Sequence, residues 1–86
     1  MNQSILFPDL QSWDETKQSI CFPAQHLGQS IECFISLERL VKLGSTSING
    51  KAQALQVFDE LRFDIEELAE ELIEDESFNS QGQIEI

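Results

Sequence analysis

The side chains best suited to chemistry in this sequence are two cysteines and one histidine. Cys21 and Cys33 are the thiol nucleophiles, and His26 is the only histidine. A thiol becomes reactive when a base, a cation or a helix N-terminus lowers its pKa, and the sequence places none of these beside either cysteine. A catalytic histidine needs an orienting carboxylate and a nucleophile, whereas His26 is expected in a hairpin turn, facing solvent. We therefore predict no catalytic residues and keep a small thiol enzyme as an alternative.

Carboxylates form the second chemically distinctive group. Residues 59–76 contain ten of them and a single base, Arg62. Like charges stand four residues apart, as in Glu66 and Glu70, and each such pair costs a few tenths of a kcal/mol on a helix. Negative charge near a helix C-terminus also opposes the helix dipole. A segment that works against its own structure indicates a function, while a solvated face that keeps a small protein soluble is the simpler interpretation.

A divalent cation is another ligand that these carboxylates could hold. Glu67, Glu71 and Glu74 are the best placed, because carboxylate oxygens suit hard cations. However, the segment has no Glu-x-x-His pair and no calcium-loop pattern. The chain also lacks a Cys-x-x-Cys motif, zinc-ligand spacing and a glycine-rich phosphate loop. We therefore predict no metal and no cofactor, with a metal-dependent enzyme as the alternative.

One large apolar residue, Phe63, stands among the carboxylates. It lies about half a helical circumference from the apolar side of the same helix. Aromatic residues and arginine are enriched at the centres of protein interfaces, so Phe63 and its neighbour Arg62 are candidates for binding a partner. The alternative is that a bend of the helix, or another segment, covers Phe63. The predicted binding residues are Arg62, Phe63, Glu66, Glu67, Glu70, Glu71 and Glu74.

A long helix is needed to position these residues. Apolar residues recur at steps of three and four from Ala54 to Leu72, which places them on one side of a single uninterrupted α-helix. Asn49 or Gly50 should cap its start, and it should end near Asp75. The apolar side consists of Ala54, Phe58, Leu61, Ile65, Leu68, Ala69 and Leu72.

Two runs with strand character, 17–25 and 29–36, precede the helices. Gly28 can take the positive φ that a tight hairpin turn requires, so Leu27 and Gly28 should form the loop. The resulting register places six side chains on one face, and a slip by one residue would break this pattern. The opposed pairs are Ala24 with Ile31, Phe22 with Cys33, and Ile20 with Ile35.

The same register makes two further predictions. Cys21 and Cys33 point to opposite faces of the sheet and should not form a disulfide. Pro23 removes one donor from the ladder, so its strand should be at an edge or locally irregular.

Shorter elements complete the predicted order. Residues 1–7 should form a short strand, and Leu10 to Thr16 a connection whose Trp13 covers one edge of the core. Ser36 is a suitable N-cap for a short helix, Leu37 to Leu43.

The segments that end elements can also be assigned. Gly44 fits the end of the short helix, and 45–50 should be a polar loop. Residues 77–82 read as a turn, and Gln83 to Ile86 as a final strand.

Composition sets the general class of protein. A chain of 86 residues with 41% apolar residues is a single domain, 1–86. Five basic residues against sixteen acidic ones give a net charge of −11, which opposes binding to nucleic acid and favours basic partners. The N-terminus lacks the features of a secretory signal, and no apolar run is long enough to cross a membrane. We therefore predict a cytoplasmic protein.

The chain resembles the YrdB-type family of small bacterial proteins, a domain family of unknown function. The resemblance covers nearly the whole chain, and Cys21–Ala24 and Arg62–Asp64 are its more distinctive segments. It departs from the family in Phe63, where Trp is usual, and in Leu27-Gly28, where an Asn-Gly type of turn is usual. The resemblance implies a small cytoplasmic α+β protein and brings no catalytic residues. It rests on Met1–Ile5, Phe7–Asp9, Trp13–Glu15, Cys21–Ala24, Cys33, Ile35–Ser36, Phe58, Arg62–Glu67 and Leu72–Ile73.

We therefore expect an α+β domain. A small, mainly antiparallel β-sheet should pack against one long C-terminal amphipathic helix plus a short helix. The final strand could pair within the chain or with a second copy. The predicted core comprises Phe22, Ile31, Cys33, Ile35, Leu40, Phe58, Leu61, Ile65, Leu68 and Leu72.

The expected function is that of a non-enzymatic protein-interaction module. Its acidic helix face would bind a basic protein partner or a second copy of the chain, including as a homodimer, with Phe63 as the aromatic anchor. The alternative from another class is a mimic of nucleic-acid charge that occupies the basic groove of a nucleic-acid-binding protein.

Overall fold

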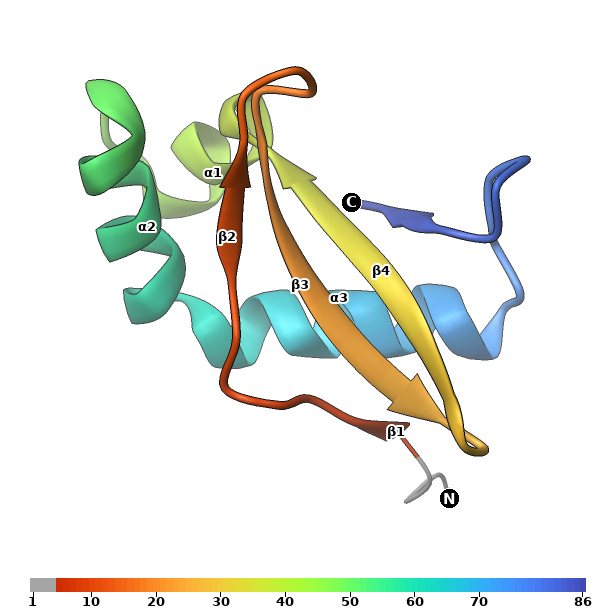
Figure 1. Cartoon of the computed structure of the whole chain (residues 1–86). Helices are drawn as coiled ribbons and strands as arrows, with labels where there is room; N and C mark the ends of the chain where they lie inside the picture. The colour runs from red at the N-terminus through yellow and green to blue at the C-terminus, as the bar shows by residue number, and fades with distance from the viewer. Residues whose placement is uncertain (1–4) are drawn as a thin grey trace.

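In the computed structural model, which describes residues 5–86, three helices lie on one side of a five-stranded sheet (Figure 1). The fold is α+β, as expected from the sequence. Of the predicted strand at residues 1–7, positions 1–4 lie outside the described residues. In chain order the elements are β1 Ile5–Leu6, β2 Ser12–Asp14, β3 Ser19–His26, β4 Gln29–Ser36, α1 Leu37–Gly44, α2 Gly50–Glu60, α3 Arg62–Glu74 and β5 Ile84–Glu85.

The sheet is mainly antiparallel. Its strand order is β1-β3-β4-β5. β2 also pairs with β3, along the same edge of β3 as β1. Among residues 5–86 the one parallel pair is β4 with β5, where Cys33 lies opposite Ile84. The final strand therefore pairs within the chain, because the chain passes through all three helices before it returns to the far edge of β4.

The central hairpin has the predicted register. Ala24 pairs with Ile31, Phe22 with Cys33 and Ile20 with Ile35. Both loop residues have positive φ, 55° at Leu27 and 79° at Gly28, as a two-residue type I′ turn requires. A branched apolar side chain at such a position is unusual, since only Gly and, less often, Asn or Asp adopt it easily.

Pro23 occupies a local gap in the sheet. On the far side of β3 from β4, β1 pairs with Gln25 and His26, and β2 pairs with Ser19, Ile20 and Cys21. Pro23 falls between these two short strands, where no ladder formed by residues 5–86 needs its missing N–H. The predicted local irregularity is therefore present, although β3 lies inside the sheet.

Ser12–Asp14 forms a strand, so the prediction of a simple connection over Leu10 to Thr16 was wrong for these three residues. Trp13 pairs with Ile20 across the ladder and packs against the core while remaining half-buried. Its indole Nε1 donates to Glu15 Oε1 at 2.8 Å. Three residues give too short a pattern to separate a strand from a loop.

The single long helix predicted from Ala54 to Leu72 is two helices. α2 ends at Glu60 and α3 begins at Arg62, with Leu61 between them at φ −104° and ψ 15°. The Leu61 N–H donates to the carbonyls of both Val57 and Phe58, which tightens the last turn of α2. No glycine or proline marks this break, and tertiary packing accounts for it: α2 contacts α1, β2 and β3, whereas α3 crosses behind the strands and contacts β5 (Figure 1).

The break also changes which residues are buried. Six of the predicted core residues are fully buried, and Ile31 is 8% exposed. Leu61, Leu68 and Leu72 are only half-buried, while Ile73 is 2% exposed. The helical direction changes at Leu61, so the buried side of α3 runs through Ile65, Ala69 and Ile73. The six fully buried residues are Phe22, Cys33, Ile35, Leu40, Phe58 and Ile65.

α1 begins as predicted and ends one residue later. Ser36 is the N-cap, and its hydroxyl accepts from the Arg39 N–H at 3.1 Å. Gly44 is the last helical residue, and Ser45 rather than Gly44 takes the left-handed conformation, with φ 52°. A Cβ at Gly44 would lie 3.4 Å from Val57 and 3.5 Å from Leu61, which is ordinary van der Waals contact, so the packing there does not require glycine.

Candidate functional site

The candidate site is the outer face of α3. Phe63, Glu67, Glu70 and Glu74 follow one another at helical steps of four, three and four residues, so they share one stripe, with Glu71 beside it. Phe63, Glu67, Glu71 and Glu74 are exposed, and Glu70 is half-buried. These five residues are called the acidic face below.

Phe63 is the most exposed large apolar residue among residues 5–86, at 86%. The alternative in which another segment covers this side chain is therefore wrong for the described part of the chain. The core lies on the opposite side of α3, where Ile65 and Ala69 are fully buried.

Arg62 is positioned quite differently from Phe63. Its side chain is only 13% exposed, because the first turn of α3 directs it toward the loop between β1 and β2. Its Nη2 donates to the carbonyl of Pro8 at 2.8 Å and its Nη1 to Gln11 Oε1 at 2.7 Å. An Asp9 carboxylate oxygen lies 3.7 Å from Nη1. Arg62 therefore connects two segments that are far apart in the sequence.

Glu66 completes this arrangement. The Arg62 Nε donates to Glu66 Oε2 at 2.9 Å, one turn along α3, and the Glu66 side chain is 18% exposed. The guanidinium carbon also lies 5.3 Å from the centre of the Phe58 ring. Arg62 and Glu66 thus hold the loop, α2 and α3 together, and this contact fixes the first turn of α3 from which Phe63 projects.

The structure divides the seven predicted residues into two groups. Arg62 and Glu66 form the internal contact, and the other five form the acidic face. Sequence reasoning missed the structural role of Arg62, although one signal was available: Arg62 and Glu66 are an oppositely charged pair four residues apart. The loop residues that Arg62 binds could not have been found, because they are more than fifty positions away.

The thiols lie apart from the acidic face, whereas His26 lines a hollow together with Glu74. Burial and the adjacent Cys21 raise the pKa of Cys33 to about 12, and burial followed by Glu32 and Asp14 raises the pKa of Cys21. Both cysteines are free, as the register predicted. His26 ends β3 and is half-buried rather than solvent-facing. Within residues 5–86, no group of three metal-ligating side chains is placed to hold an ion.

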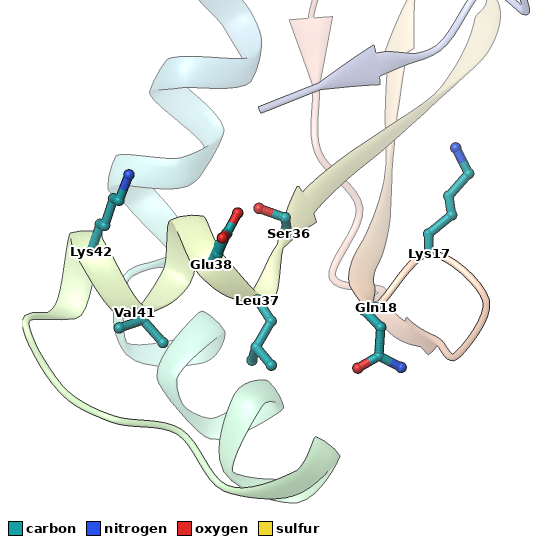
Figure 2. Close-up of a pocket in the computed structure, with 7 residues that line it drawn as sticks. All are labelled: Lys17, Gln18, Ser36, Leu37, Glu38, Val41 and Lys42. Atoms are coloured by element: carbon teal, nitrogen blue, oxygen red, sulfur yellow. The ribbon is translucent and has the colours of Figure 1, made fainter.

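A hollow of about 510 Å³ lies at the opposite end of the molecule, between the turn before β3 and the first turns of α1 (Figure 2). Leu37 and Val41 provide its apolar surface. Lys17 and Lys42 stand at its two sides. In the part of the chain that the structure describes, no helix is long and apolar enough to span a membrane.

The geometry defines a small α+β domain with one acidic helical face, and comparison with known proteins identifies its family. The family DUF1488, described as a protein of unknown function, matches residues 5–86. The chain therefore belongs to the DUF1488 family, which confirms the resemblance to YrdB-type proteins.

Individual relatives agree along the whole chain. The uncharacterised protein YrdB of Escherichia coli K12 is 43% identical over 98% of this chain and 96% of its own length. The uncharacterised YrdB of Shigella flexneri is 42% identical over the same shares. A crystal structure at 1.60 Å of a DUF1488 protein of unknown function from Shewanella loihica PV-4 matches with a TM-score of 0.94 and 46% identity, covering 100% of this chain and 94% of that one.

Proposed function

We propose that this protein is a non-enzymatic interaction module whose acidic face binds a basic protein partner. The observation that carries the proposal is the 86% exposure of Phe63 on a helix face otherwise made of carboxylates. Leaving an aromatic ring in water gives up the free energy of burying it, and a partner that covers the ring recovers that free energy.

The carboxylates would give the complex its speed and its specificity. A chain of net charge −11 attracts basic surfaces over distances comparable to the Debye length. Glu67 lies one turn and Glu70 two turns from Phe63 along the same stripe, so a partner's lysines or arginines would meet carboxylates beside the buried ring. Arg62 is the nearest base, and its charge is already matched by Glu66 and Asp9.

The rigid mounting of α3 also favours this role. Binding residues held in place lose little conformational freedom when a partner arrives. The contacts of Arg62 with the β1–β2 loop fix the first turn of α3, and Ile65, Ala69 and Ile73 anchor the rest of the helix in the core.

The test compares wild type with Phe63→Asp as baits in native extract, with captured proteins identified by mass spectrometry. Leu27→Asp is the matched control, because Leu27 is 77% exposed on the hairpin turn and the substitution adds the same charge. We expect a basic protein held by wild type and by Leu27→Asp, lost by Phe63→Asp, and released as salt is raised.

Three other outcomes decide between interpretations. If all three baits hold the same proteins, the acidic face is only a solvated surface. If the complex is lost with Phe63→Asp but does not respond to salt, Phe63 binds the partner and the electrostatic part of the proposal fails. If DNA or RNA competes with wild type for the captured partner, the module acts as a mimic of nucleic-acid charge.

A further inference from the structure

The acidic face has the spacing of a surface on which a second helix packs. Phe63, Glu67, Glu70 and Glu74 are separated by four, three and four residues, the alternation that relates facing positions along a coiled coil. α3 lies behind the strands, and its buried side faces the core, so this stripe points away from the sheet (Figure 1). A second helix can follow the stripe, because its own side chains recur with the same period.

The length of the stripe distinguishes a helical partner from an extended one. Phe63 and Glu74 are eleven positions apart, which is about 16 Å along the helix axis, or about 5.5 Å for each step. Side chains on one face of an extended strand recur about every 6.7 Å, so after three steps they would be displaced by about 4 Å from the stripe. A partner helix with the same spacing of three and four residues stays in step.

Phe63 supplies the apolar contact of this surface. In helix packing, a projecting side chain inserts into a hole formed by four residues of the facing helix. The ring is 86% exposed at the first turn of α3, so it is available for such a hole. A leucine and the carbon stems of lysine or arginine can line the hole, since these stems pack on apolar surface while their charges stay in water.

The rest of the stripe requires positive charge on the partner. Glu67 and Glu70 occupy the next two positions, and Glu71 lies beside them. The one base of α3, Arg62, is already paired with Glu66 at 2.9 Å. An apolar helix laid on this face would take carboxylates out of water without a partner, which is costly. Lysines or arginines at the facing positions avoid that cost.

We propose that the partner presents an α-helix with lysines or arginines along one side, packed antiparallel to α3 on the acidic face. The antiparallel direction follows from the helix dipoles, because the positive N-terminal end of the partner's helix is favoured beside the negative C-terminal end of α3. The partner's apolar residue then lies toward its own C-terminus, against Phe63. This inference rests on the proposed function, since it names the form of the basic partner that binds the same face.

Two synthetic peptides of identical composition and about 18 residues, five helical turns, test the proposal. In the helical peptide, three lysines and then one leucine follow at steps of four, three and four residues. In the control peptide, the same residues stand at every second position, as on one face of a strand. Binding to wild type is measured by fluorescence anisotropy at about 0.05 M NaCl, where screening is weak.

We expect the helical peptide to bind at least about tenfold more tightly than the control peptide, and difference circular dichroism to show that the bound peptide is helical. Phe63→Asp should lose this preference, whereas Leu27→Asp should keep it. Equal affinities of the two peptides, no binding by either, or a bound peptide that is not helical overturns the proposal.

An exchange of charges tests the register. Glu67→Lys should weaken the helical peptide about tenfold, and replacing the lysine next to the peptide's leucine by glutamate should restore most of the affinity. Glu38→Lys is the matched control, because it makes the same change of charge at an exposed position on α1. If Glu38→Lys weakens binding equally, only the net charge of the chain attracts the peptide, and the proposal fails.

Failure of this proposal and failure of the proposed function give different results. If the helical peptide shows no preference but native extract still yields a basic protein that depends on Phe63, the proposed function stands and only the helical form of the partner is wrong. If Phe63→Asp changes neither experiment, both proposals fail.

Discussion

Two adjacent residues, Arg62 and Phe63, show how one helical turn separates structural from surface roles. The Arg62 side chain is 13% exposed and the Phe63 residue 86% exposed. Successive helix positions point about 100° apart, so one faces the β1–β2 loop while the other faces solvent. Adjacency in the sequence suggested a shared role that the geometry does not support.

Removing the Arg62 contacts should destabilise the fold. Arg62→Met keeps an unbranched stem but leaves the Pro8 carbonyl and the Glu66 carboxylate without their donor. Hydrogen bonds to charged groups are worth about 1.5–3 kcal/mol, so we expect the free energy of unfolding to fall by about 2 kcal/mol in urea titrations followed by Trp13 fluorescence. The control Arg39→Met, at an exposed position, should change it by less than about 0.5 kcal/mol. Equal effects in the two variants would contradict this assignment.

Cys33 should make stability depend on alkaline pH. Its pKa rises from 9.0 to about 12 on folding, so above about pH 9 the folded state holds a proton that the unfolded state has released. Stability is therefore full below pH 9 and declines as the pH rises toward 12. Urea midpoints at pH 8, 9 and 10 should fall more steeply for wild type than for Cys33→Ala. Parallel slopes would show that other groups cause the decline.

Among the elements, the β3–β4 hairpin was the most predictable. Alternating apolar residues and Gly28 defined both its register and its turn. Leu27 takes a φ of 55°, although its branched apolar side chain disfavours that conformation. The register is imposed by burial of six side chains on one face, and this burial outweighs the strain at the exposed turn.

Relieving that strain should stabilise the protein. Leu27→Asn replaces a residue that disfavours the left-handed conformation with one that tolerates it, and Leu27 is 77% exposed, so little packing is lost. We expect the free energy of unfolding to rise by about 1 kcal/mol. Gly28→Ala, at φ 79°, should lower it by a similar amount. A neutral or destabilising effect of Leu27→Asn would mean that Leu27 makes contacts that the structure does not show.

The break between α2 and α3 at Leu61 could not be predicted from the sequence. The periodicity of apolar residues continues across it, and neither Gly nor Pro is present. The break arises because α2 and α3 pack on different elements. The break affects the candidate site because Phe63 lies in the first turn of α3, directly after it.

For the whole molecule, the dominant feature is the charge imbalance. The formal net charge is −11 in 86 residues, and α3 repeats like charges one turn apart, which costs a few tenths of a kcal/mol for each pair. The core must offset this repulsion, which salt can screen.

Added salt should therefore stabilise the monomer. Raising NaCl from about 0.02 M to about 0.5 M shortens the Debye length several-fold, and we expect urea midpoints to rise by an amount equivalent to about 1 kcal/mol. The triple variant Glu67→Gln, Glu70→Gln, Glu71→Gln should start more stable and respond less to salt. A wild-type midpoint that does not change with salt would show that the carboxylates are too well solvated to repel.

The sequence by itself determined the α+β class, the hairpin register, the Ser36 cap, most of the core and the stripe of carboxylates with Phe63 on it. These features follow from contacts between residues a few positions apart, so local periodicity and turn chemistry specify them. Tertiary structure decided the break at Leu61, the parallel pairing of β5 with β4, the burial of Ile73 and the clamp of Arg62 on Pro8. Each of these features depends on contacts between segments that are far apart in the sequence. Local sequence patterns do not predict such contacts.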